Sequence, residues 1–205
     1  MAKMKFYVLW IALGLIIVFL LQTFFDIVTD VFILSEVSWT QPWRFVSAVF
    51  LHGSFAHLLS NLFALVFFGI ILEKLVGSKK FLGIFLISGI LANVVAINFY
   101  PNSLGASGAI MGIIGALAII RPLMMVWAFG MILPMAVAAV FWILIDAIGI
   151  FIPDNVGNIA HLSGVFFGVV FGIIFRYNNS SKRKKHIVEV PEHILRRWET
   201  LYMRS

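Results

Sequence analysis

The chain alternates long apolar stretches with short polar connections. A helix that crosses a bilayer needs about 20 mostly apolar residues. On this criterion we predict six membrane spans, over residues 6–25, 54–72, 81–99, 107–120, 123–145 and 156–175. The predicted fold class is therefore all-α: a polytopic membrane protein with a six-transmembrane-helix bundle.

The first, fourth and fifth predicted spans each have an unusual feature. The first is too long for a signal peptide and lacks a small-residue cleavage site, so we expect it to be retained. The fourth is short, and the fifth contains Pro134, which we interpret as a kink. We divide the chain into a six-span membrane core, residues 1–176, and a basic tail, residues 177–205.

The composition indicates the same class. Hydrophobic residues make up 62% of the 205 residues and charged residues only 12%, against about 25% charged in globular domains. Such a chain cannot cover a water-facing surface, so lipid is its expected solvent. The sequence contains no Cys, which excludes disulfides, thiolate metal sites and a Cys nucleophile.

The basic residues lie almost entirely on one side of the predicted bundle. All Lys and Arg residues except Arg44 fall in the even-numbered loops or near the two ends of the chain. The positive-inside rule then puts both termini in the cytoplasm and the loop 26–53 outside. This distribution accounts for the net charge of +6, so we expect a multi-pass cell-membrane protein that binds lipid and no nucleic acid.

The tail has two open interpretations. Its basic run, Lys182 to Lys185, would lie beside the membrane and touch anionic headgroups. Pro191 could start a short interfacial helix, with these apolar residues on one side: Ile194, Leu195, Trp198, Leu201 and Tyr202. The alternative is a partly disordered, solvated tail.

Four strongly polar residues fall inside the predicted spans: His57, Asn61, Ser107 and His161. Such residues are costly in lipid and are functional candidates by default. Counted from the cytoplasmic ends of their spans, they lie roughly 18–24 Å above that boundary, at about 1.5 Å per residue. All four therefore fall in one layer, roughly 10 Å below the outer surface of a hydrocarbon core of about 30 Å.

Glycines would let two of these spans approach each other. Both carry small residues at helical spacing beside a reactive residue: Gly108, Gly112 and Gly115 after Ser107, and Gly164, Gly168 and Gly172 after His161. Such faces allow close backbone packing, which would bring the hydroxyl and the imidazole within hydrogen-bonding reach. Packing without catalysis is the other interpretation of these glycines.

A hydroxyl and an imidazole at one depth point to nucleophilic catalysis. Ser107 would attack as nucleophile, and His161 would accept its proton as the base. No carboxylate is near His161 in the sequence. Asp146 and Asp154 are candidates for a third member, but we expect a Ser–His dyad without Asp.

An oxyanion hole would complete such a site. Ser107 stands where a helix begins, and the free backbone N–H groups there could bind a developing negative charge. His57 and Asn61 are four residues apart on one helix face, so both could donate hydrogen bonds to the same point. Hydrolysis further requires a polar hollow that admits water.

Each residue also has an interpretation without catalysis. Ser107 could bond its own helix backbone, His161 could be a satisfied core histidine, and Asn61 could bridge helices. We interpret Glu73 as a structural anchor at a helix end. For Asp146 a capping or tertiary hydrogen bond is preferred over a role in proton relay.

The histidines also raise the question of a zinc site. His52, His57 and His161 could in principle bind the metal, but no HExxH-type pairing exists. Nothing in the sequence resembles a nucleotide cradle either. We therefore expect no metal and no cofactor.

The sequence resembles the rhomboid family of intramembrane serine proteases over about residues 6–175. Three motifs carry the resemblance, in this order on the predicted spans: HxxxN at His57 and Asn61, GxSG at Gly105, Ser107 and Gly108, and AHxxGxxxG at His161, Gly164 and Gly168. The combination is far more specific than a lone GxSG.

Other positions match the family or depart from it. Trp43 and Arg44 resemble the WR pair of the first outer loop, and Glu73 stands where the family has a structural glutamate. Asn158 lies three residues before the histidine, as in some members. Met111 departs, because many members have an aromatic residue there, stacked on the histidine; sulfur can pack against such a ring, though less firmly.

The resemblance implies an activity. Rhomboid proteases use a Ser–His dyad, with the HxxxN residues in the oxyanion hole, and cut single-span membrane proteins in or near the transmembrane segment. The fifth span and the loop 151–157 would gate access. Three rivals remain: an inactive rhomboid-like protein that binds membrane clients, a transporter with a polar midplane site, and a structural scaffold.

Overall fold

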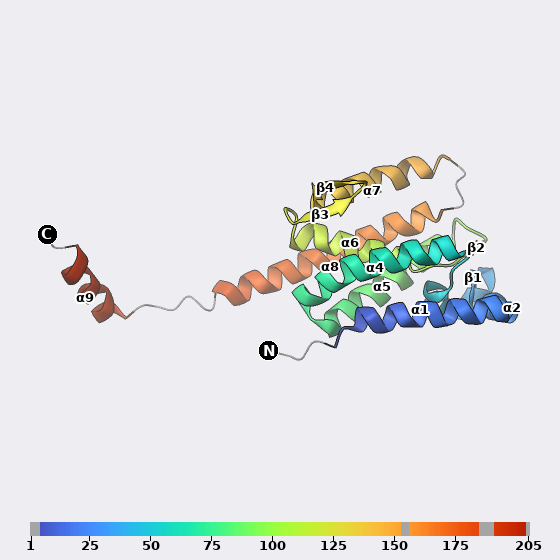
Figure 1. Ribbon diagram of the computed structural model, residues 1–205, viewed down its shortest axis with the longest axis horizontal. Coiled ribbons are helices and arrows are strands. Elements are labelled where there is room, and N and C mark those ends of the chain that lie inside the picture. The colour runs from blue at the N-terminus through green and yellow to red at the C-terminus, as the bar shows by residue number, and fades with distance from the viewer. Residues whose placement is uncertain (1–4, 153–155, 185–190, 204–205) are drawn as a thin grey trace. The chain divides into compact units, whose positions relative to one another are not determined.

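The computed structural model describes residues 5–152, 156–184 and 191–203 (Figure 1). It divides into two units, Met1–Phe175 and Arg176–Ser205. The first unit contains, in chain order, α1 (Tyr7–Phe24), α2 (Asp26–Phe32), β1 (Leu34–Ser35), the 3-10 helix η1 (Glu36–Trp39), α3 (Arg44–Ser47), the 3-10 helix η2 (Ala48–Phe50), α4 (Phe55–Val76), α5 (Ser78–Ala96), β2 (Asn102–Ser103), α6 (Ser107–Ile120), β3 (Met125–Ala128), β4 (Met131–Pro134), α7 (Met135–Gly149) and most of α8 (Asn158–Lys184).

Six apolar helices form the bundle, as predicted. Helices α1, α4, α5 and the Asn158–Tyr177 part of α8 are long and apolar enough to cross a membrane. The other two, α6 and α7, are shorter. The all-α, six-helix fold class is therefore confirmed. Figure 1 shows α1 and α7 at opposite edges of the bundle, with α4, α5, α6 and the part of α8 up to Phe175 between them.

Helix α6 is the centre of the bundle. Every residue from Gly108 to Leu117 is buried, and the helix packs against α4, α5 and α7. Its 14 residues span roughly 21 Å at 1.5 Å per residue, less than a hydrocarbon core of about 30 Å. Non-helical backbone just before it, at residues 103–106, is tolerable at that depth because these residues are buried or half-buried.

Helices α6 and α8 meet backbone to backbone through their glycines. A Cβ added to Gly164 would collide with the carbonyl oxygen of Gly108, and one added to Gly168 would collide with that of Gly112. At Gly108 an added Cβ would lie 2.8 Å from the Cβ of Ala92 on α5. No side chain larger than hydrogen fits these positions, so the predicted glycine faces do pack together.

The first half of the predicted fifth span is wrong. Residues 125–134 form an antiparallel hairpin in which Met125 pairs with Pro134 and Ala128 with Met131. Phe129 (φ 54°) and Gly130 (φ 78°) make its two-residue turn, which requires positive φ at both positions. Pro134 therefore precedes α7 rather than kinking a longer helix, as its fixed φ favours at a helix start.

Arg44 organises the segment between α1 and α4. Its side chain is buried, and its Nη1 group donates to the carbonyl oxygens of Asp30 (2.8 Å) and Ile33 (2.9 Å). The Nε group donates to the side-chain oxygen of Gln41 at 2.7 Å. Trp43 is about half exposed. The cation thus closes a turn-rich loop through three hydrogen bonds instead of facing the cavity described below.

Glu73 holds the first helix against the fourth. Its two carboxylate oxygens accept the backbone N–H groups of Tyr7 (2.9 Å) and Val8 (3.0 Å), the first residues of α1. The side chain is fully buried. A negative charge at a helix N-terminus satisfies orphan donors and complements the helix dipole, which is the anchoring expected of this residue.

The second unit contains the end of α8 and α9 (Glu192–Tyr202). Helix α8 continues to Lys184, beyond the predicted span end at 175. Pro191 precedes α9 directly, and the apolar residues predicted for one side of this helix are all exposed. Lys185, the last residue of the basic run, lies outside the described residues. An interfacial position for α9 stays a prediction.

Candidate active site

The predicted site residues from three helices line one cavity of about 1320 Å³. His57 and Asn61 come from α4, Ser107 from the start of α6, and His161 from the first turn of α8. Asp146 of α7 lines it as well. The layer of polar residues inferred from span depths is therefore part of a single cavity with polar groups on several walls.

Ser107 is the first residue of α6, and Ala106 is its N-cap. Gly105, just before them, has a φ of 127°, and its N–H donates to the carbonyl oxygen of Ala48 at 2.9 Å. The N–H of Ile110 bonds the Ala106 oxygen, so helix geometry leaves the N–H groups of the preceding positions without helical partners. These donors belong to the helix start that carries Ser107, which lines the cavity.

Gly105 and His57 are in close contact. A Cβ added to Gly105 would lie 2.7 Å from the Cε1 atom and 2.9 Å from the Nε2 atom of the His57 ring. The same point is 3.8 Å from Ser107 Oγ. The imidazole of α4 and the hydroxyl of α6 thus flank the same glycine, which places His57 beside the nucleophile candidate.

The α4 residues are held by local hydrogen bonds. Ser54 caps α4, and its Oγ accepts the N–H of His57 at 3.1 Å. The Asn61 amide is buried and donates one hydrogen bond to the carbonyl oxygen of His57 at 2.8 Å. An Asn amide carries two N–H groups, so this hydrogen bond uses only one of them, and Asn61 lines the cavity.

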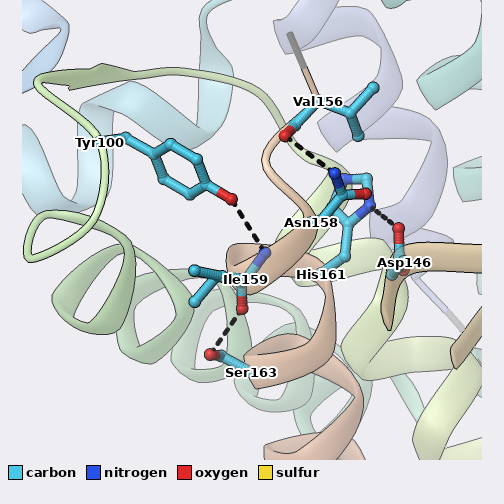
Figure 2. A network of polar contacts seen from close by, with 7 residues as sticks. All are labelled: Tyr100, Asp146, Val156, Asn158, Ile159, His161 and Ser163. Atoms are coloured by element: carbon cyan, nitrogen blue, oxygen red, sulfur yellow. Dashed lines mark hydrogen bonds and ion pairs between the residues drawn. The ribbon is translucent and has the colours of Figure 1, made fainter. Parts of the chain in front are cut away.

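His161 has a carboxylate partner. Its Nδ1 atom lies 2.9 Å from Oδ1 of Asp146 (Figure 2), and Asp146 is only 5% exposed. This contact runs against the expected Ser–His dyad without Asp, whereas the tertiary hydrogen bond expected for Asp146 is confirmed. The residues are 15 apart in the chain and belong to two consecutive helices, α7 and α8. Asp154, the other candidate, lies outside the described residues.

The turn before His161 is tied down from two sides. The hydroxyl of Tyr100 accepts the N–H of Ile159 at 3.1 Å (Figure 2). The Asn158 side chain is buried against Gly149 of α7, where an added Cβ would lie 2.6 Å from Asn158 Nδ2. Asn158, which the sequence suggested without a role, therefore packs the end of α7 against the start of α8. The predicted gate 151–157 is only partly within the described residues.

Ser107 and His161 face the cavity from adjoining backbones. The carbonyl oxygen of Ala160 would lie 3.5 Å from a Cβ on Gly108, so the residues next to the pair touch. Among the described residues, the Ser107 hydroxyl has no hydrogen-bond partner. Catalytic hydrogen bonds are commonly long before substrate binds. Met111 is buried and lines the same cavity.

The sequence did not predict that His52 is buried against the ring of His57. It is 2% exposed, its ring meets that of His57 edge-on at 5.1 Å between centroids, and neither ring nitrogen has a described hydrogen-bond partner. It precedes the span that begins at Phe55. Burial, aided by the neighbouring His57, lowers the pKa of the His52 imidazole to about 4. The only indication of this contact in the sequence was that His52 lies five residues before His57.

Fold and cavity define a class: a multi-pass helical membrane protein with a serine, histidines and a carboxylate around one internal cavity. A family model for the Rhomboid domain matches residues 39–178, more than half of the chain. The chain therefore belongs to the rhomboid family, a family that includes serine proteases.

Relatives from distant organisms agree. RHOMBOID-like protein 6, mitochondrial, of Arabidopsis thaliana is 31% identical over 140 residues, which are 67% of this chain and 45% of that protein. Rhomboid protease GluP of Bacillus subtilis (strain 168) is 34% identical over 131 residues, 62% of this chain and 24% of that protein. Rhomboid-like protease 3 of Toxoplasma gondii is 40% identical over 80 residues, which are 38% of this chain and 30% of that protein. The chain thus spans less than half the length of each.

Proposed function

We propose that the chain is an intramembrane serine endopeptidase that hydrolyses a peptide bond in or near the transmembrane segment of single-span membrane proteins. One observation carries the proposal: Ser107, at a helix N-terminus, shares a cavity with His161, His57 and Asn61. Relatives named as rhomboid proteases support it. Both reactive residues are present, which argues against an inactive client-binding relative.

Acylation comes first in this mechanism. Ser107 Oγ attacks the scissile carbonyl carbon while its proton passes to His161 Nε2. The negative charge that forms on the carbonyl oxygen is stabilised by the N–H groups at the start of α6 and by donors from His57 and Asn61. The C–N bond then breaks, and His161 gives the proton to the leaving amine.

Deacylation repeats the cycle with water. His161 accepts a proton from a water molecule in the cavity, and the resulting nucleophile attacks the acyl-Ser107 ester. When the C–Oγ bond breaks, the proton returns to Ser107 and a carboxylic acid product leaves. The polar walls of the cavity allow water to reside among otherwise apolar helices.

We further propose the orientation of the chain in the cell membrane. Nearly all Lys and Arg residues lie at the chain ends or in the connections that share their side, which favours a cytoplasmic location for both termini. The segment with Arg44 would then face outward, and the cavity would open to the extracytoplasmic side.

The test compares wild type with Ser107→Ala, each purified in detergent and reconstituted in liposomes. A labelled single-span substrate should be cut by wild type, with a rate at least about 10³-fold lower in the variant, because a catalytic nucleophile is lost. A fluorophosphonate probe should label wild type and leave the variant unlabelled. Equal cleavage by the two proteins would refute the proposal.

A further inference from the structure

We infer that Asp146 is a positioning residue that holds His161 in the orientation and tautomer needed for catalysis, which makes the site a Ser–His–Asp triad. The inference rests on the proposed protease function and extends it to a residue outside the three motifs. Asp146 belongs to α7, a helix that contributes neither Ser107 nor the α4 donors.

The position of Asp146 requires an explanation. It is the only ionisable residue between Arg121 and Asp154, and it lies near the end of an apolar helix with 5% of its surface exposed. A buried carboxylate is costly unless paired and hydrogen-bonded. Among the described residues, its carboxylate has one hydrogen-bond partner, His161 Nδ1, at 2.9 Å. Oδ2 has no hydrogen bond there.

The contact determines which ring nitrogen can act as base. An ionised carboxylate only accepts hydrogen bonds, and a neutral imidazole has one N–H and one free lone pair. Pairing with Asp146 therefore places the hydrogen on Nδ1 and leaves Nε2 of His161 free to take the proton of Ser107. Without the carboxylate the ring could populate the other tautomer, in which Nε2 carries the hydrogen and cannot accept one.

A neighbouring contact, between Asn158 and Gly149, holds α7 and α8 together without using the charge of Asp146. Gly149 is three residues after Asp146, and Asn158 is three before His161; they pack against each other on the same faces of α7 and α8. The two helices should therefore stay together when Asp146 is replaced by the isosteric Asn.

Asp146 also compensates for Met111. The resemblance expects an aromatic ring there to support the histidine from α6, and Met111 offers only a flexible thioether. A hydrogen bond from α7 constrains both the ring plane and the tautomer, which stacking alone does not. The orientation of His161 is thus set by a helix other than the one that carries the nucleophile.

The experiment uses the full chain with Asp146→Asn, Asp146→Glu and, as a matched control of the same chemistry at an exposed site, Asp26→Asn. We expect Asp146→Asn to lower kcat about 10²–10⁴-fold with little change in KM, as loss of a triad carboxylate does elsewhere. Fluorophosphonate labelling of Ser107 should slow in parallel. Asp146→Glu should recover part of the activity, and the control should match wild type.

A readout independent of turnover is the tautomer of His161, from nitrogen NMR shifts of histidine-labelled protein, assigned with His161→Gln. Wild type should show a protonated Nδ1 and a bare Nε2. A protonated Nε2 in wild type, or unchanged kcat in Asp146→Asn, would overturn the inference. If wild type cleaves nothing and Ser107 does not react, the proposed protease fails, whereas the tautomer still reports on the Asp146 contact. Should the Asn variant not fold, the wild-type tautomer decides.

Discussion

Gly105 lies between the His57 ring and the first turn of α6, with a φ of 127° that L side chains rarely adopt. Its missing side chain leaves room for the imidazole at 2.7 Å from where a Cβ would stand. The glycine of the GxSG motif therefore serves the site in two ways: it lets the backbone turn toward Ser107, and it lets a donor residue approach from α4.

Gly105→Ala should lower kcat at least about 10²-fold, because the Cβ would displace His57 from the oxyanion position and strain the turn by about 1–3 kcal/mol. Gly53→Ala is the matched control, since it lines the same cavity but its Cβ would stand 3.6 Å from the nearest atom, on Leu104. Cleavage of a labelled substrate measures both. Equal losses in the two variants would contradict the explanation.

His52 makes stability depend on pH. Its folded-state pKa of about 4 is below the ordinary value of 6.5, so the unfolded chain binds the proton first as the pH falls. The neutral His52 therefore leaves the free energy of unfolding unchanged above pH 6.5. As the pH falls from 6.5 to about 4, that free energy decreases by at most roughly 3 kcal/mol.

Thermal unfolding in detergent at pH 7.5 and pH 4.5 should therefore show a smaller loss for His52→Gln than for wild type. The Gln side chain keeps polar groups near His57 but has no proton to gain in this range. Parallel pH profiles for the two proteins would show that another group causes the acid sensitivity.

At the scale of elements, the contact between α6 and α8 explains how two reactive residues from distant parts of the chain meet. A Cβ added to Gly164 or Gly168 of α8 would collide with a glycine carbonyl of α6, so no side chain separates the backbones. In lipid, close packing of this kind replaces the hydrophobic driving force that holds soluble helices together.

Gly164→Ala should separate these helices, because its Cβ has no space beside the Gly108 carbonyl. Overpacking of this kind costs about 1–3 kcal/mol, and a small shift of His161 should reduce cleavage more than tenfold. Gly83→Ala on α5 is the control: nothing lies within 4 Å of its Cβ, so unfolding midpoint and activity should be retained. A Gly164 variant with wild-type activity would contradict the packing argument.

At the β3–β4 hairpin, the pattern of apolar residues wrongly predicted the start of a membrane span. Exposure alternates along β3, with Val126 and Ala128 buried and Met125 and Trp127 exposed. All four are apolar, so the alternation cannot be seen in a sequence whose surroundings are themselves apolar. Phe129 and Gly130 were the only local indication of a turn. The long apolar run around them predicted a continuous helix instead.

At the scale of the whole molecule, the proposed orientation can be tested directly because the chain contains no Cys. Single cysteines at Ser205 and at Trp39 should label from opposite sides of intact cells with a membrane-impermeant maleimide. We expect labelling of Trp39→Cys from outside and of Ser205→Cys only after permeabilisation. The reverse pattern, or labelling of both from outside, would contradict a cytoplasmic C-terminus.

The sequence alone determined the membrane class, six apolar helices and the family, because lipid burial demands long apolar runs and because the three motifs are local. It also assigned Ser107, His161, His57 and Asn61 to one layer, since helix rise converts position into depth. Contacts between distant segments were decided only in three dimensions. The pairing of Asp146 with His161, the tight fit of His57 on Gly105 and the β3–β4 hairpin all depend on how backbones meet, which no local pattern records.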